Sequence, residues 1–210
     1  RISAIAGLSV PYSPRGEMSQ IELFKMVFEG KFFYILYFQK EGEAEAEFEK
    51  DMRKGLELTY FSGDSRGMLK RFESTEETLD KDPNSKFLEG AFEFDVYPEW
   101  ITKEEMDYFV SQFEMSGMRG PINRYRAQNQ DWEELSDLPD QLEQPAFFIV
   151  GTLDPTNFFV PSAEPLAKRI GPNYKNLLIV EELEGIGHWT QQEAPDQVNK
   201  LIMEFLAKID

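Results

Sequence analysis

Two residues of the sequence combine side-chain types and positions that suit proton transfer. His188 is the only histidine among the 210 residues, and it lies in the stretch GIGHWTQ, between a glycine-flanked turn and a predicted helix. Asp154, in GTLDPTN, follows the apolar run 146–151 much as His188 follows the apolar run 176–183. Imidazole titrates near neutral pH and can take a proton from water, and a carboxylate beside it orients the ring. The two residues predict the base and the orienting acid of a hydrolytic site.

Each of the two residues also has a structural interpretation when it is taken alone. A single histidine is often a packing or surface residue, and an aspartate before Pro155 commonly forms a turn. The positions of Asp154 and His188 favour a functional role, because α/β proteins place their binding and catalytic sites in the loops at the carboxyl ends of parallel strands. We therefore interpret Asp154 and His188, at two consecutive strand ends, as members of one site.

One candidate nucleophile lies within the chain. The stretch GDSRG (63–67) matches the pattern G-x-S-x-G around Ser65, and the order Ser, Asp, His is one in which hydrolases carry a triad. A nucleophile of that kind follows a buried strand, whereas the preceding residues DMRKGLELTYF are charged and continue a predicted helix. We therefore interpret GDSRG as a glycine-rich turn and expect the nucleophile to lie outside these 210 residues.

The elements that must position these side chains alternate between sheet and helix. Short apolar runs predict buried strands, and apolar positions at spacings of three and four predict helices. The helix over 101–117 also carries a capping box formed by Thr102 and Glu105. We predict strands over 1–10, 146–151 and 176–183, helices over 18–30 (capped by Ser19), 41–58, 101–117, 161–171 and 195–209, a short helix with a linker over 119–135, and irregular structure over 59–100. This order predicts an α/β fold in which a helical insertion interrupts a parallel sheet.

Composition excludes several classes of function. The chain has 39 acidic and 22 basic side chains, a formal net charge of −17, and this charge repels phosphate backbones and anionic lipid. It has no cysteine, which excludes disulfides, thiolate catalysis and cysteine-based metal sites. We expect no nucleic-acid partner, no membrane association, no metal and no cofactor, and a cytoplasmic location.

Four stretches resemble one known family, the soluble epoxide hydrolases of the α/β-hydrolase superfamily. EGIGHWTQQEAPDQVNKLIMEFL is similar to the histidine segment of that family, and RISAIAGLSVPY to the strand just before its cap. FFYILYFQKEGEAEAEFEKDMRK resembles the first cap helices, and FEMSGMRGPINRYR a later cap segment. The resemblance implies a partial α/β-hydrolase fold with a helical cap inserted after the first strand, residues 1–10 and 137–210 forming the core and 11–136 the cap.

The resemblance also implies a role for each matching residue. In that family an aspartate opens the epoxide as an alkyl-enzyme ester, two cap tyrosines bind the epoxide oxygen, and a His–Asp pair activates water. Tyr34 matches the first tyrosine, Tyr125 the second, Asp154 the orienting acid and His188 the base. Tyr37, three residues after Tyr34, competes for the first tyrosine's role. The apolar residues Phe33, Phe38 and Trp189 beside these positions are expected to bind the small-molecule epoxide substrate.

The chain departs from the family in one respect. The first half of the core sheet, the H-G-x-P loop and the nucleophilic aspartate have no counterpart in the sequence, so we expect a fragment that is inactive alone. Alternatives remain open: a haloalkane or haloacid dehalogenase or an esterase of the same fold, or a non-catalytic hydrolase-like binding domain. Either a monomer or a homodimer is compatible with the sequence.

Overall fold

The computed structural model describes residues 2–74, 81–158 and 164–209, which form two compact units. The sheet unit comprises Arg1–Pro14, Gly63–Leu69 and Leu138–Asp210, and the helical unit comprises Arg15–Ser62 and Lys70–Asp137. The core and cap boundaries expected from the sequence remain a prediction.

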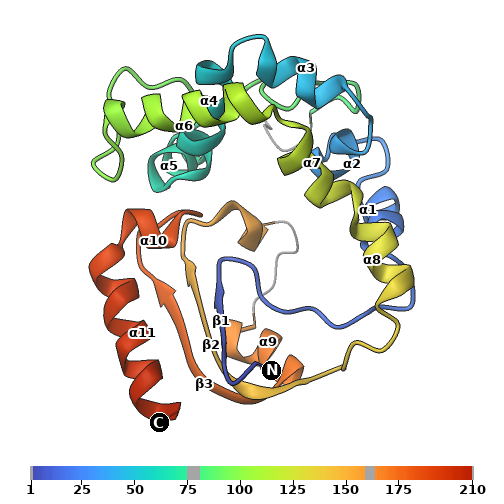
Figure 1. The fold of residues 1–210 in the computed structure, drawn as a ribbon, viewed down its shortest axis with the longest axis vertical. Helices are drawn as coiled ribbons and strands as arrows, with labels where there is room; N and C mark the ends of the chain where they lie inside the picture. The colour runs from blue at the N-terminus through green and yellow to red at the C-terminus, as the bar shows by residue number, and fades with distance from the viewer. Residues whose placement is uncertain (1, 75–80, 159–163, 210) are drawn as a thin grey trace. The chain divides into compact units, whose positions relative to one another are not determined.

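The sheet unit is built on three parallel strands in the order β1-β2-β3 (Figure 1). These strands are β1 (Ile5–Leu8), β2 (Leu142–Gly151) and β3 (Tyr174–Leu183). Gly151 pairs with Leu183, so the carboxyl ends of β2 and β3 lie side by side. The predicted α/β fold with a parallel sheet is confirmed, with β1 shorter and β2 and β3 longer than predicted.

The central strand β2 carries the core of the sheet unit on both faces. Phe147 and Ile149 pack on the side of α11 (Pro195–Ile209), and Ala146, Phe148 and Val150 pack on the side of α9 (Leu166–Ile170). These five side chains of β2 are all buried, as expected of a parallel strand covered by helices on both sides. The sheet is therefore a rigid support for the loops at its carboxyl ends. Of the predicted helix 161–171, residues 161–163 lie outside the described part of the chain.

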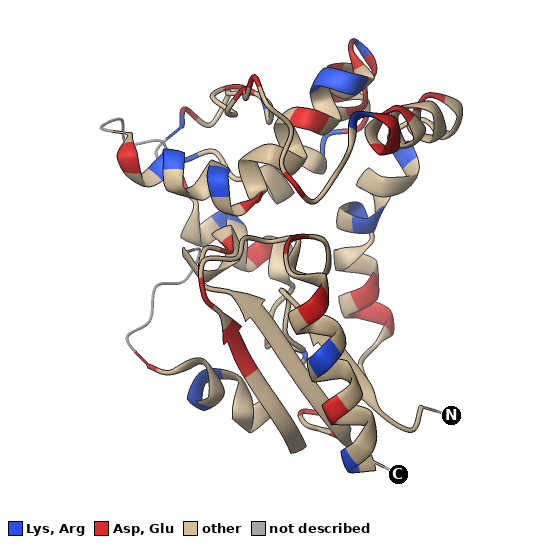
Figure 2. Cartoon of the chain, turned by 90° about the vertical axis from the view of Figure 1, so that its left-hand side faces the viewer, with Lys and Arg blue, Asp and Glu red and all other residues tan. Residues whose placement is uncertain are grey.

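The helical unit encloses an aromatic core. Buried members include Tyr37, Phe38, Phe48, Phe61 and Met106. The helices that contribute to the unit are α1 (Gln20–Val27), α2 (Tyr34–Phe38), α3 (Glu43–Glu49), α4 (Met52–Gly63), α5 (Ser65–Glu73), α6 (Lys103–Ser116), α7 (Arg119–Arg126) and α8 (Gln128–Glu134). Ser19 caps α1, and the capping box of Thr102 and Glu105 opens α6, as predicted. Acidic residues are spread over helices and loops of the chain (Figure 2).

Two predictions in this region are wrong. The helix predicted over 41–58 is interrupted, because Asp51 accepts a hydrogen bond from the backbone N–H of Lys54 at 3.0 Å and so caps a new helix, α4. The stretch predicted as irregular is helical as far as Glu73: α4 ends at Gly63, and Asp64 caps α5 through the N–H of Gly67 at 2.9 Å. GDSRG is thus a junction of two helices and not a simple turn. Residues 75–80 lie outside the described part of the chain.

Among the described residues, no helix is both long and apolar enough to cross a membrane.

Candidate active site

His188 and Asp154 form a hydrogen-bonded pair in the sheet unit. The Nδ1 atom of His188 lies 2.9 Å from Oδ2 of Asp154. The Asp154 side chain is fully buried, whereas 25% of the His188 side chain is exposed. A carboxylate on Nδ1 favours the tautomer that carries the proton there, which leaves Nε2 as the proton acceptor. This is the arrangement of a general base with its orienting acid.

The loop after β2 fixes the second oxygen of Asp154. Oδ1 accepts hydrogen bonds from the backbone N–H of Thr156 at 2.8 Å and from its hydroxyl at 2.7 Å. The N–H of Asp154 itself donates to the carbonyl of Gly151, the last residue of β2, at 3.0 Å. One carboxylate oxygen is therefore held by the loop and the other is directed to the imidazole. Thr156 is not among the site residues predicted from the sequence, although an Asp two residues before a Thr is a local signal for this turn.

The loop after β3 approaches the end of β2 more closely than a side chain would allow. A Cβ atom at Gly151 would lie 2.1 Å from the carbonyl oxygen of Ile186 and 2.3 Å from that of Gly187. The N–H of Leu153 donates to Ile186 at 2.9 Å, which joins the two loops. Glycine at position 151 is therefore needed for the contact that brings the aspartate loop and the histidine loop together.

Trp189, predicted to bind substrate, lies beside the imidazole. Its ring meets the ring of His188 edge to face, with centroids 4.7 Å apart. Its indole also packs against the backbone of Gly63, where an added Cβ would lie 3.4 Å from Nε1. Trp189 thus forms an apolar wall next to the imidazole of His188.

Tyr34 and Tyr125 form a second pair, within the helical unit. Tyr34 is the first residue of α2 and Tyr125 lies in α7, and their ring centroids are 5.7 Å apart at an interplanar angle of 82°. Burial raises the pKa of the Tyr125 phenol above its ordinary value of 10.0. A buried phenol stays protonated at neutral pH and can donate a hydrogen bond to a developing oxyanion.

Tyr37, the alternative to Tyr34, has its hydroxyl engaged elsewhere. The hydroxyl donates to Oε2 of Glu47 at 2.9 Å, and the ring is buried in the core of the helical unit. Burial and this hydrogen bond raise the pKa of Tyr37. Tyr34 rather than Tyr37 contacts the ring of Tyr125, so the geometry favours Tyr34 for a paired role.

Phe38 and Phe33, both predicted to bind substrate, are buried side chains around the tyrosines. The Phe38 ring lies 5.6 Å from that of Tyr34 and 5.0 Å from that of Tyr125. Phe33 stacks on Phe28 at 3.9 Å and contacts Tyr34 at 5.1 Å. Both phenylalanines support the tyrosine rings by packing.

A buried ion pair ties together the helices that carry the tyrosines. Arg126, next to Tyr125, makes a two-pronged contact with the carboxylate of Glu45, and both side chains are almost buried, at 12% and 11% exposure. Its Nε donates to the carbonyl of Phe38 at 2.8 Å, at the end of α2. The hydrogen bond from Arg126 lowers the pKa of Glu45 to about 2. Arg126 therefore joins α7 to α2 and α3.

Replacing Arg126 by Met is expected to lower the free energy of unfolding by about 3 kcal/mol or more at pH 7, because it leaves the Glu45 charge buried and unpaired. Because the pKa of Glu45 is lowered, the contribution of the Arg126–Glu45 ion pair to the stability of the wild-type protein depends on pH. It is fully present above the ordinary glutamate value and is lost as the pH falls toward about 2. Urea unfolding at pH 7 and pH 3 would measure both effects.

The exposed pair of Lys25 and Glu22 provides the control for this prediction. Both of its side chains are more than half exposed, so Lys25→Met is expected to change stability by less than about 0.5 kcal/mol. Equal destabilisation by Arg126→Met and Lys25→Met would contradict the structural role of Arg126.

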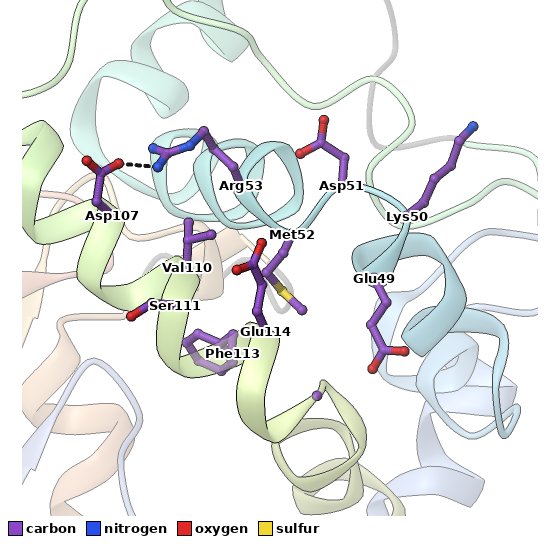
Figure 3. Close-up of a pocket in the computed structure, with 11 residues that line it drawn as sticks. Glu49, Lys50, Asp51, Met52, Arg53, Asp107, Val110, Ser111, Phe113 and Glu114 are labelled. Atoms are coloured by element: carbon purple, nitrogen blue, oxygen red, sulfur yellow. Dashed lines mark hydrogen bonds and ion pairs between the residues drawn. The ribbon is translucent and has the colours of Figure 1, made fainter.

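A cavity of about 740 Å³ lies elsewhere in the helical unit, between the start of α4 and the last turns of α6 (Figure 3). Its lining is largely charged, and an ion pair joins Arg53 to Asp107 across one side. None of the predicted site residues lines this cavity. Among the described residues, no group of three or more acidic or histidine side chains could hold a metal ion.

The chain is similar to several proteins over nearly its whole length. It is 34% identical to Epoxide hydrolase A of Mycobacterium tuberculosis over 100% of this chain and 63% of that protein. It is 31% identical to Bifunctional epoxide hydrolase 2 of Rattus norvegicus over 98% of this chain and 35% of that protein. The chain thus spans less than two thirds of the length of these relatives. No family model matches it.

Two solved structures superpose well on the chain. The crystal structure of Epoxide Hydrolase A from Mycobacterium thermoresistibile gives a TM-score of 0.84 at 32% identity, over 99% of this chain and 62% of that one. An epoxide hydrolase from an endophytic Streptomyces gives 0.83 at 34% identity, over 98% of this chain and 60% of that one. The similarity in sequence and the similarity in structure therefore point to the same group of proteins.

Proposed function

Because the chain belongs to the epoxide hydrolases of the α/β-hydrolase family, we propose that it serves epoxide hydrolysis, the addition of water to an epoxide to give a vicinal diol. The observation that carries the proposal is the His188–Asp154 pair at adjacent strand ends, in the same chain as the paired phenols Tyr34 and Tyr125. The two pairs supply a base for water and two hydrogen-bond donors for an oxyanion, the groups that the reaction needs.

The first step of the proposed mechanism opens the ring. A carboxylate from outside the 210 residues attacks one epoxide carbon, forms an ester and breaks the C–O bond of the ring. Negative charge develops on the departing oxygen, and Tyr34 and Tyr125 stabilise it by donating hydrogen bonds; one phenol then transfers its proton. The engagement of the Tyr37 hydroxyl by Glu47 supports the choice of Tyr34 for this role.

The second step hydrolyses the ester. Nε2 of His188 takes a proton from water while the water oxygen attacks the ester carbonyl, and buried Asp154 stabilises the imidazolium that forms. Collapse of the tetrahedral intermediate releases the diol and regenerates the carboxylate, and proton exchange with solvent restores the neutral imidazole and the phenol. His188 acts in this second step only, so its loss is expected to leave ring opening intact.

The proposal is tested by measuring the diol formed from styrene oxide by chromatography. We expect turnover by a complete protein that also contains the nucleophile and none by residues 1–210 alone. A single turnover in ¹⁸O-labelled water is expected to place the label in the nucleophilic carboxylate. Turnover by the 210 residues would overturn the assignment of the nucleophile, and absence of turnover by the complete protein on a panel of aryl and alkyl epoxides would overturn the function.

A further inference from the structure

The backbone on both sides of His188 is held by hydrogen bonds from distant parts of the sheet unit. The N–H of His188 donates to the carbonyl of Gly63 at 3.0 Å, and its carbonyl accepts from the hydroxyl of Ser9 at 2.6 Å. The N–H groups of Gly187 and Trp189 both donate to the carboxylate of Glu193, each at 3.1 Å. The polar backbone groups that determine the direction of the His188 side chain are therefore fixed.

Glu193 is the centre of this arrangement. Besides Gly187 and Trp189, its carboxylate accepts from the N–H of Ser65 at 2.9 Å, so one side chain binds three backbone donors. Hydrogen bonds to an ionised carboxylate are shorter and stronger than neutral ones. A glutamine at this position would present an NH₂ group to at least one of the three donors, and that contact is repulsive.

The junction in GDSRG provides the surface on which the histidine loop rests. A Cβ atom at Gly187 would lie 2.5 Å from the backbone of Asp64 and 2.5 Å from the nitrogen of Ser65, so the two backbones are in direct contact. Asp64 is fully buried and caps α5 through the N–H of Gly67, which makes the junction rigid. The stretch that resembles a serine nucleophile motif thus contacts the histidine loop through its backbone.

We propose that Glu193 is a positioning residue for His188: its carboxylate joins the histidine loop to the Gly63–Ser65 junction and so holds the imidazole against Asp154. The inference rests on the proposed function where His188 is called the base, but the placement of the imidazole can be measured without turnover. Loss of the carboxylate is expected to loosen residues 187–189 while the strands and the helix α11 remain folded.

Proton NMR of the 210-residue chain reads the placement of His188 directly, because the chain holds no other histidine. The Nδ1–H proton that bonds to Asp154 is expected to give a downfield signal protected from exchange. We expect this signal to broaden or disappear in Glu193→Gln and to return in part in Glu193→Asp. The matched control is Glu184→Gln, because Glu184 is an exposed carboxylate at the start of the same loop.

Kinetics of a complete enzyme provide the second readout. In Glu193→Gln we expect kcat to fall by about 10- to 100-fold, with ring opening in a single turnover changed by less than about twofold. A wild-type signal in Glu193→Gln would overturn the proposal. Unfolding of the whole chain by this substitution, seen by circular dichroism, would also overturn it, because Glu193 would then maintain the fold rather than the histidine. An inactive wild type would count against the proposed function alone, since the NMR result does not depend on turnover.

Discussion

In a complete enzyme that also contains the nucleophile, replacing Asp154 by Asn is expected to lower kcat for epoxide hydrolysis by about 10³- to 10⁴-fold while the protein stays folded. The carboxylate accepts the Nδ1 proton of His188 at 2.9 Å and is fully buried, so no water replaces it. An amide in its place cannot stabilise an imidazolium, and its NH₂ group favours the tautomer with the proton on the wrong nitrogen. The contacts of Thr156 to Oδ1 remain possible with the amide oxygen, which is why folding is expected to survive.

Mass spectrometry of the reacting enzyme identifies the step that fails in Asp154→Asn. Because the proposed role of the His–Asp pair is to activate water, the ester is expected to form normally and to accumulate, and the protein is expected to gain the mass of the bound substrate. The control is Asp196→Asn, an exposed carboxylate in the first turn of α11, for which we expect unchanged turnover. Wild-type rates in Asp154→Asn, or loss of activity without accumulation of the ester, would be inconsistent with the role assigned to this pair.

Removing the hydroxyl of Tyr34 or Tyr125 is expected to have the second largest effect. Each phenylalanine substitution keeps the ring contact at 5.7 Å but removes one of the two donors that we propose for the developing oxyanion. Loss of a single donor of this kind costs about 10²- to 10³-fold in rate. We expect that loss in kcat/KM for each single variant and little detectable ring opening in the double variant, without accumulation of the ester.

Tyr37→Phe is the matched control for the tyrosine pair, because it removes a hydroxyl three residues from Tyr34. That hydroxyl donates to Glu47, so we expect a loss of about 1 kcal/mol in stability and less than a twofold change in kcat/KM. Stopped-flow fluorescence under single-turnover conditions would measure ring opening in each variant. A larger loss of kcat/KM in Tyr37→Phe than in Tyr34→Phe would reverse the assignment of the first tyrosine.

The sequence by itself determined the parallel sheet and the two strand ends that carry Asp154 and His188. This was possible because the signals are local: apolar runs of strand length recur between helical patterns, and the polar residues follow the runs directly. The start of α6 was predictable for the same reason, since Thr102 and Glu105 bond to each other's backbone within one turn. All the residues that form a pattern of this kind lie within a few positions of one another, so the sequence shows the whole pattern.

Only the tertiary structure shows what GDSRG, Glu193 and the competing tyrosines contact. GDSRG is a helix junction because Asp64 caps α5. Glu193 accepts a hydrogen bond from Ser65 of this junction, although the two residues are 128 positions apart in the chain. The hydroxyl of Tyr37 is engaged by Glu47, ten positions later in the chain. Motif and spacing describe one segment at a time, whereas a buried polar group is satisfied by whichever donors the fold brings to it. For that reason the residues that could do chemistry were visible in the sequence, and the residues that hold the histidine in place were not.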